Sequence, residues 1–146
     1  MADWTFRPAT DEDLERIADL KVLVIRPHLE RLRPWDEASA RHYLYVRWHA
    51  ANVRVIEVGG EFAGCVALRQ AEDCRWIEQF YLYPQFQGQG LGTAVIGALL
   101  EECDADGQVV RLDVLQQSPA RRLYERHGFT LEHEDELDAF LIRRPR

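Results

Sequence analysis

The sequence predicts a mixed α/β fold in one domain, residues 1–146, with a mostly antiparallel sheet. Three observations support this prediction. Strand-like runs and runs with helical spacing follow one another in the order β-α-α-β-β-β-α-β-α-β-β. Gly59-Gly60 separates two strand-like runs, as in a tight β-hairpin. Further on, one strand-like run leads through a helical run to another, a connection whose crossover makes the two strands parallel.

The first strand is predicted at Trp4-Thr5-Phe6-Arg7, where apolar and polar residues alternate. Thr10 is a suitable N-cap for a first helix, and the acidic residues that follow suit the positive end of the helix dipole. Helical spacing continues to about Arg26, before Pro27. A second helix is expected after Pro34, running toward Ala51. Its apolar positions are Ala38, Tyr43, Val46 and Trp48.

The remaining elements follow in order. Strands are predicted at 53–58, 61–69 and 75–83, the last ending at Pro84. A helix covers about 91–104 and a strand 108–115. Ser118-Pro119 is a strong helix start, and Gly128 ends that helix. The segments FTLEHE and DAFLIRR complete the chain as a hairpin.

Composition excludes several classes of function. The chain of 146 residues is 47% hydrophobic and 29% charged, as in soluble globular proteins. No run approaches the roughly 18 apolar residues of a membrane span, and the acidic N-terminus does not resemble a signal peptide. A net charge of −7 disfavours nucleic acid as a partner. Cys65, Cys74 and Cys103 have no metal-site or disulfide spacing. We expect a cytoplasmic protein without a metal or membrane partner.

The stretch PQFQGQGLGT, residues 84–93, places three alternating glycines between a strand and a helix. It is not a dinucleotide fingerprint, because the third glycine slot falls on Thr93 or Val95, and it lacks the GK[ST] of a P-loop. Glycines before a helix N-terminus let an anion approach unpaired N–H groups at the positive end of the dipole. The stretch therefore favours phosphate or pyrophosphate binding over a plain connecting turn.

Two motifs resemble the GNAT superfamily of acyl-CoA-dependent N-acetyltransferases. Gln87-Gly88-Gln89-Gly90-Leu91-Gly92 matches the family's Q/R-x-x-G-x-G/A signature. About 40 residues further on, SPARRLYERHGF (118–129) is similar to its second signature, N-x-x-A-x-x-L-Y-x-x-x-G-F. The element order resembles the whole GNAT domain, so the likeness covers nearly the full chain.

The resemblance implies acetyl-CoA as cosubstrate, bound where a parallel pair of strands splays apart. Pantetheine would pair with the backbone of Leu82 and Tyr83, and the amides of residues 88–93 would hold the pyrophosphate. Ser118 replaces the usual asparagine of the second signature. The implied cofactor-binding set is Leu82, Tyr83, Gln87, Gly88, Gln89, Gly90, Leu91, Gly92, Thr93, Ser118 and Tyr124.

Two residues are candidates for proton transfer. Glu78 lies in an apolar and aromatic strand, where alternation places it with Trp76, Phe80 and Leu82. Such a carboxylate is either ion-paired or functional. Many GNAT enzymes carry a catalytic glutamate on this strand, often working through a water, so Glu78 is the candidate general base. Tyr124 matches the family's tyrosine that protonates the departing thiolate; the alternative is a packing role.

The acceptor pocket of the family involves the first two helices. Here Arg26, Arg31 and Arg33 surround a short proline-bounded loop near Trp35. These four residues are candidate acceptor-binding residues, with one arginine pairing with an acceptor carboxylate. An exposed basic helix end anchored by Trp35 is the alternative.

Together these features predict an N-acetyltransferase that transfers acetyl from acetyl-CoA to a primary amine of a small molecule or peptide. The amine would attack directly in a ternary complex. One alternative is a non-catalytic acyl-CoA sensor, which would tolerate loss of the Tyr124 hydroxyl. Another is a ping-pong enzyme with a nucleophilic cysteine, for which only Cys74 merits a test. Pairing of edge strands could also form a homodimer.

Overall fold

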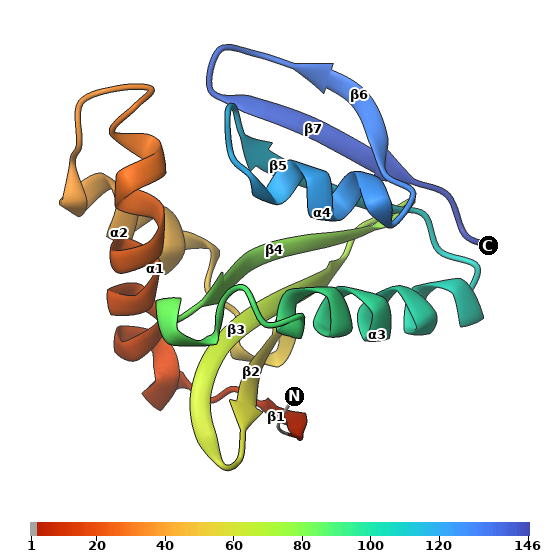
Figure 1. Ribbon diagram of the computed structural model, residues 1–146, viewed down its shortest axis with the longest axis horizontal. Coiled ribbons are helices and arrows are strands. Elements are labelled where there is room, and N and C mark those ends of the chain that lie inside the picture. The colour runs from red at the N-terminus through yellow and green to blue at the C-terminus, as the bar shows by residue number, and fades with distance from the viewer. Residues whose placement is uncertain (1–2) are drawn as a thin grey trace. The chain divides into compact units, whose positions relative to one another are not determined.

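A computed structural model describes residues 3–146, and its order of strands and α-helices is the predicted one (Figure 1). The strands are β1 (Trp4–Pro8), β2 (Val53–Val58), β3 (Glu61–Gln70), β4 (Arg75–Leu82), β5 (Val110–Leu115), β6 (Thr130–Glu134) and β7 (Asp138–Arg143). The helices are α1 (Leu14–Leu29), α2 (Glu37–Arg47), α3 (Leu91–Ala105) and α4 (Ala120–Arg126). Short 3₁₀ turns are η1 (Asp11–Asp13), η2 (Ala50–Asn52) and η3 (Pro84–Phe86).

The chain divides into two compact units that share strands β3 and β4. The first contains the chain up to Ala67 together with Gln79–Gln89, and the second contains Leu68–Glu78 and Gly90–Arg146. The strand order is β1-β2-β3-β4-β5-β7-β6, mostly antiparallel, with β4 and β5 as a parallel pair. The mixed α/β fold is therefore confirmed, whereas a single domain over residues 1–146 stays a prediction.

In the first unit, β1 and β2 pair antiparallel from Trp4–Val58 to Pro8–Arg54, and β2 continues antiparallel to β3. Helices α1 and α2 lie side by side (Figure 1). Their buried residues share one apolar cluster with the strands: Ala9, Ile17, Ala18, Leu20, Leu44, Val53, Val55, Phe62, Cys65 and Ala67. As expected, Thr10 caps the turn that leads into α1, and its N–H donates to the Asp13 carboxylate over 2.8 Å.

The first helix is longer than predicted. It continues past Arg26 to Leu29 and contains Pro27. A proline in the last turn removes one hydrogen bond, to the carbonyl of Leu23, and Leu23 is exposed, so water can satisfy that carbonyl. The helix closes normally one turn later, where Glu30 N–H donates to the Arg26 carbonyl.

The second helix is shorter than predicted. It ends at Arg47, because Trp48 is already extended. Ala40 and Leu44 are buried, whereas Tyr43 and Val46 are 45% and 57% exposed. At the start of the helix, the Asp36 side chain accepts from Ser39 N–H and caps it. Of the apolar positions expected on this helix, Tyr43 and Val46 therefore lie on its exposed side, and Trp48 lies beyond its end.

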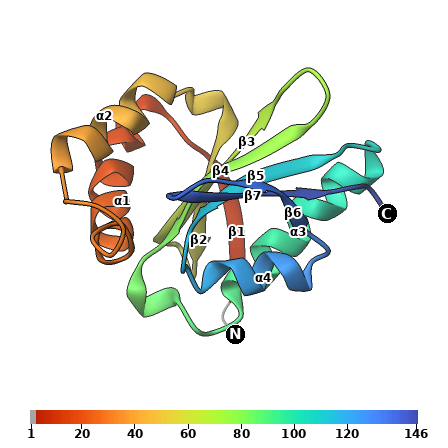
Figure 2. The same cartoon turned by 90° about the horizontal axis from the view of Figure 1, so that it is seen from above.

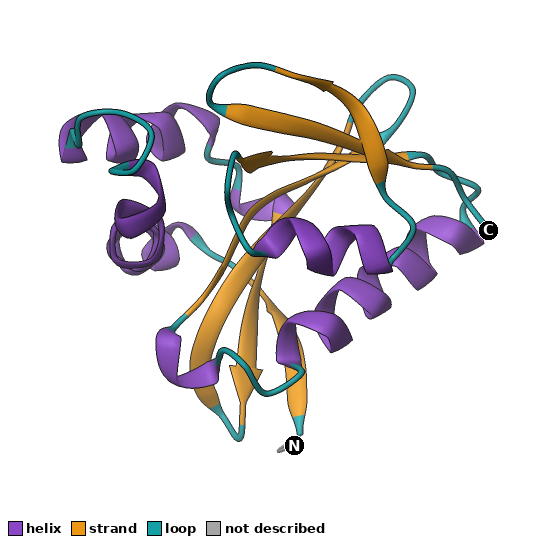
Figure 3. Cartoon of the chain, turned by 45° about the horizontal axis from the view of Figure 1, so that its top comes forward, coloured by secondary structure: helices purple, strands orange, loops and turns teal. Residues whose placement is uncertain are grey.

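In the second unit, β4 begins parallel to β5, with Arg75 opposite Val110 and Trp76 opposite Arg111. The hairpin of β6 and β7 extends this sheet beyond β5, and all of its pairings are antiparallel (Figure 3). Helices α3 and α4 lie on the same side of β5 and β7 (Figure 2). In the described part of the chain, no helix is long and apolar enough to cross a membrane.

Candidate active site

The predicted site residues are distributed over both units. The first unit contains Arg26, Arg31, Arg33, Trp35, Leu82, Tyr83, Gln87, Gly88 and Gln89. The second contains Glu78, Gly90, Leu91, Gly92, Thr93, Ser118 and Tyr124. Strand β4 and the glycine stretch each pass from one unit to the other, so the geometry is given within each unit.

The end of β4 lies against β3 at a glycine. A Cβ on Gly64 would lie 2.1 Å from the Tyr81 carbonyl oxygen and 2.9 Å from the Leu82 side chain. Only glycine therefore permits this approach of the two backbones. Beyond it, Tyr83 N–H donates to the Ala63 carbonyl over 2.9 Å, and the Tyr83 carbonyl accepts from Phe86. Of the two residues expected to pair with pantetheine, Tyr83 thus already uses its N–H within the protein.

The alternation expected along β4 is interrupted at Gln79. Its φ of +49° lies in the left-handed region, which a non-glycine residue seldom occupies. Two contacts hold it there: Cys65 Sγ lies 3.3 Å from its carbonyl oxygen, and Tyr81 Oη donates to its Oε1 over 3.0 Å. A residue in this conformation acts like a bulge, which re-aims the residues after it. Local sequence pattern gives no sign of such a change.

The glycine stretch is braced from within by its own glutamines. Gln87 Nε2 donates to the Leu82 carbonyl and Gln89 Nε2 to the Gln85 carbonyl, each over 2.8 Å. Gly88 and Gly90 have φ of +72° and +84°, and a Cβ on either would meet nothing within 4 Å. The backbone conformation thus favours glycine at both positions, and the space that a side chain would occupy there is empty.

Helix α3 begins directly after this stretch, with Gly90 as its N-cap. The carbonyl of Gly90 accepts from Ala94 N–H, the first bond of the helix. The N–H groups of the first turn have no partner within a helix and form the positive end of its dipole. Because Gly88, Gly90 and Thr93 are exposed, an anion can reach this end.

Glu78 is ion-paired. Arg69, at the end of β3, donates from Nε to Glu78 Oε1 over 2.8 Å, and the Glu78 side chain is 23% exposed. The ion-pair alternative is thus present in the structure, and one carboxylate oxygen is engaged. A role as general base stays a prediction.

Helix α4 places Tyr124 in its last turn. Regular helix begins at Ala120, yet Ser118 performs the predicted capping, because its Oγ accepts from Ala120 N–H over 3.2 Å. Tyr124 is 8% exposed, and its ring meets Phe129 edge-on with centroids 5.9 Å apart. Burial, with a smaller contribution from Asp113, raises the pKa of Tyr124 above its ordinary value. The raised pKa keeps the hydroxyl protonated, and because it makes no hydrogen bond within residues 3–146, it is available as a donor.

Comparison with known proteins identifies the family. The model of the acetyltransferase (GNAT) family matches residues 20–129, a span that includes both the glycine stretch and Tyr124. The chain belongs to the GNAT family. Membership confirms the resemblance drawn from the two motifs.

Relatives are found across most of the chain. An uncharacterized N-acetyltransferase of Methanocaldococcus jannaschii is 26% identical over 86% of this chain and 60% of its own length. Phosphinothricin N-acetyltransferase of Streptomyces viridochromogenes is 27% identical over 85% of this chain and 73% of its own length. The present chain therefore spans only about three-fifths of the length of the Methanocaldococcus jannaschii protein.

Solved structures share the fold. A protein of Pyrococcus horikoshii has a TM-score of 0.78 at 19% identity, covering 99% of both chains. An N-acetyltransferase of Thermoplasma acidophilum, in complex with coenzyme A, has a TM-score of 0.75 at 15% identity and covers 97% of this chain and 99% of its own. N-acetylglutamate synthase of Neisseria gonorrhoeae, with coenzyme A and L-arginine, has a TM-score of 0.68 at 25% identity over 100% of this chain and 34% of its own.

The three arginines that were predicted to bind the acceptor differ in their contacts. Arg26 pairs with Glu30 over 2.7 Å and lies over the Trp35 ring at 5.4 Å. Arg31 donates to the Pro27 carbonyl and contacts Nδ1 of His28. The backbone N–H of Arg33 donates to the Leu29 carbonyl over 3.1 Å. Among residues 3–146, its side chain is the only one of the three that makes no hydrogen bond, although its charge acts on Asp36.

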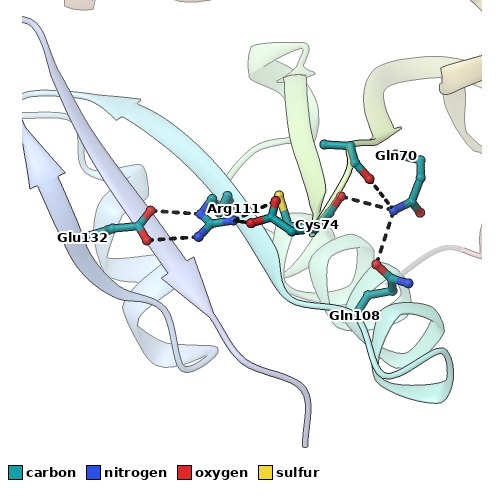
Figure 4. A network of polar contacts seen from close by, with 7 residues as sticks. Gln70, Cys74, Gln108, Arg111 and Glu132 are labelled. Carbon is teal, nitrogen blue, oxygen red and sulfur yellow. Dashed lines mark hydrogen bonds and ion pairs between the residues drawn. The ribbon is translucent and has the colours of Figure 1, made fainter.

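The three cysteines are poorly suited to act as nucleophiles in a ping-pong mechanism. All three are free and buried. Burial raises the pKa of Cys65 to about 12 and also raises the pKa of Cys103, so neither thiol ionises near neutral pH. Cys74 is 1% exposed and lies beside Arg111, which pairs in bidentate fashion with Glu132 (Figure 4). Within residues 3–146, no three His, Cys, Asp or Glu side chains are placed to hold a metal ion.

Sequence reasoning missed three features of the structure. Gly64 could have been found, because a glycine inside a strand pattern often marks a close backbone approach. The left-handed Gln79 gave no signal. The contacts of Arg143 gave no signal either, because its partners Asp104 and His127 are 39 and 16 residues away in the sequence.

Proposed function

We propose that this chain is an acetyl-CoA-dependent N-acetyltransferase whose acceptor is a primary amine of a small molecule or peptide. The observation that carries the proposal is the glycine stretch: two left-handed glycines with open space before them lead into the exposed N-terminus of a 15-residue helix. That arrangement suits the pyrophosphate of coenzyme A. GNAT relatives solved with coenzyme A support this choice.

The residues present fit the cosubstrate. Side chains at residues 88 and 90 would project into open space that a diphosphate needs, and glycine leaves that space clear. The backbone N–H groups of Leu91, Gly92 and Thr93 would donate to the pyrophosphate. When bound, acetyl-CoA supplies an acetyl group activated as a thioester. At the end of β4, the N–H of Leu82 would donate to its carbonyl oxygen. The Leu82 carbonyl already accepts from Gln87 Nε2 and would accept from pantetheine with its second lone pair.

Proton transfer falls to two side chains. The amine must lose a proton to become a product amide, and Glu78 accepts it through a water held by Oε2, since Oε1 is engaged by Arg69. The departing thiolate must gain a proton, and Tyr124 donates it from Oη. Burial keeps that proton on the phenol until a stronger base is adjacent. Attack is direct, since the three thiols are buried.

For the acceptor, we favour amines that also carry a carboxylate. Arg33 is exposed, and of the three arginines it is the one whose guanidinium makes no hydrogen bond in the described chain. A charge-assisted hydrogen bond is worth about 1.5–3 kcal/mol, so Arg33→Ala should raise KM for carboxylated amines about tenfold or more. Arg31→Ala is the matched control, and an equal effect of Arg33→Ala on uncharged amines would contradict the assignment. Two relatives are named for their acceptors: the phosphinothricin N-acetyltransferase of Streptomyces viridochromogenes, and a putative [ribosomal protein bS18]-alanine N-acetyltransferase of Bacillus subtilis.

The decisive experiment is release of free coenzyme A thiol from acetyl-CoA in the presence of simple amines, amino acids and short peptides. Release that depends on one class of amine supports the enzyme. Tight coenzyme A binding with no release from any class would instead indicate a non-catalytic acyl-CoA sensor.

A further inference from the structure

Arg143, at the end of β7, carries a buried charge that joins two helices. Its side chain is 6% exposed. Nη1 and Nη2 donate to the two carboxylate oxygens of Asp104 over 2.8 and 3.0 Å, and Nε donates to the His127 carbonyl over 2.8 Å. The whole guanidinium edge is therefore committed to α3, which contains Asp104, and to the end of α4 at His127.

The end of α4 needs such support. The helix has seven residues, too few to be stable alone, and Tyr124 lies in its last turn. The Tyr124 carbonyl accepts from His127 N–H at 2.9 Å and from Phe129 N–H at 3.2 Å. Arg143 engages the carbonyl of His127, the C-cap residue of α4, and places a cation at the negative end of the dipole. Fraying at His127 would release the two bonds that fix the Tyr124 backbone.

The other partner of Arg143 is part of a rigid element. Asp104 lies in the last turn of α3, whose first turn follows Gly90 at the glycine stretch. Its Oδ1 also accepts from Arg146 N–H over 3.1 Å. The Asp104–Arg143–His127 connection therefore links the helix that begins at the glycine stretch to the helix that carries Tyr124.

We infer that Arg143 is a positioning residue for acetyl transfer: by holding α4 against α3, it sets the Tyr124 hydroxyl relative to the first-turn amides of α3. This inference rests on the proposed function, in which those amides bind coenzyme A and Tyr124 protonates its sulfur. The geometry requires arginine, because only a guanidinium offers three coplanar donors to a carboxylate and a carbonyl at once.

Arg143→Lys tests the inference, since lysine keeps the charge but cannot serve both helices in the same geometry. Misplacement of a reacting group by about 1 Å can cost up to 100-fold, and we expect kcat to fall about tenfold with little change in the Kd for coenzyme A. The matched control is Arg75→Lys. Arg75 binds the same end of α3 through Asp106 at 2.7 Å, but its partners do not include α4. All assays are run well below the unfolding midpoint of each variant.

A double-mutant cycle separates positioning from general stability. If Arg143 acts through Tyr124, Arg143→Lys should lower kcat in the parent chain but not further in the Tyr124→Phe background. Equal losses in both backgrounds, or an equal loss in Arg75→Lys, would overturn the inference while leaving the proposed function intact. If Tyr124→Phe alone left kcat unchanged, the proposed acid role would fail first.

Hydrogen exchange gives a measurement that needs no activity. Arg143→Lys should speed exchange of the His127 and Phe129 amides, which bond to the Tyr124 carbonyl, and Arg75→Lys should leave them unchanged. Unchanged exchange at both amides in Arg143→Lys would contradict the positioning role.

Discussion

The contribution of the glycine stretch to coenzyme A binding can be separated from its contribution to folding by one pair of substitutions. Gly90, before α3, and Gly60, in the β2–β3 turn, have almost identical φ of +84° and +83°, and a Cβ on either would meet nothing within 4 Å. Replacing either by alanine should therefore impose the same left-handed strain, about 1–2 kcal/mol. Only at Gly90 does the new methyl also enter the space proposed for the pyrophosphate.

The expected result is equal loss of folding stability and unequal loss of affinity. Urea unfolding should show Gly60→Ala and Gly90→Ala destabilised alike in the absence of ligand. Calorimetric titration with coenzyme A should show an unchanged Kd for Gly60→Ala. For Gly90→Ala, loss of one charge-assisted hydrogen bond, about 1.5–3 kcal/mol, corresponds to a Kd raised about 10- to 100-fold. Equal Kd values for the two variants would refute the reasoning.

Three further predictions follow from single side chains. Tyr124→Phe should lower kcat about 100-fold, typical for loss of a general acid, and leave the unfolding midpoint nearly unchanged because the ring contact with Phe129 is retained; an unaltered kcat would remove Tyr124 from the mechanism. Gly64→Ala should cost about 1–3 kcal/mol in urea unfolding, since its Cβ meets the Tyr81 carbonyl, and wild-type stability would contradict that contact. The Arg143 guanidinium lowers the pKa of Asp104, so the ion pair stabilises the folded chain fully above pH 3.8, the ordinary pKa, and loses this effect as pH falls below it. The difference in unfolding free energy between the parent chain and Asp104→Asn should therefore shrink in acid. A difference that stayed constant with pH would exclude a link between this pKa and stability.

The element order was predictable because it depends on local patterns. The Gly59-Gly60 hairpin, the capping residue Thr10 and the Ser118 start of α4 each act over a few residues, and the structure contains all three. Helix ends were less predictable. Pro27 is tolerated in the last turn of α1 because it interrupts only one hydrogen bond there, and no local rule distinguishes that position from a helix stop.

The glycine stretch and Tyr124 were found because the family's motifs are contiguous in sequence. What the sequence did not reveal depends on contacts between distant segments. The left-handed Gln79 is contacted by Cys65, 14 residues earlier in the chain, and Arg143 meets Asp104 across 39 residues. Such features require the folded chain, since neither periodicity nor residue type specifies the partner.

The most direct test of the account compares coenzyme A with pantetheine, which lacks the pyrophosphate, by thermal unfolding of the chain. At about 100 times its Kd, a ligand stabilises by about 2.7 kcal/mol, which gives a clear shift in midpoint. The account predicts this shift with coenzyme A and little or none with pantetheine at the same concentration. No shift with coenzyme A, or equal shifts with both, would contradict pyrophosphate binding by the glycine stretch.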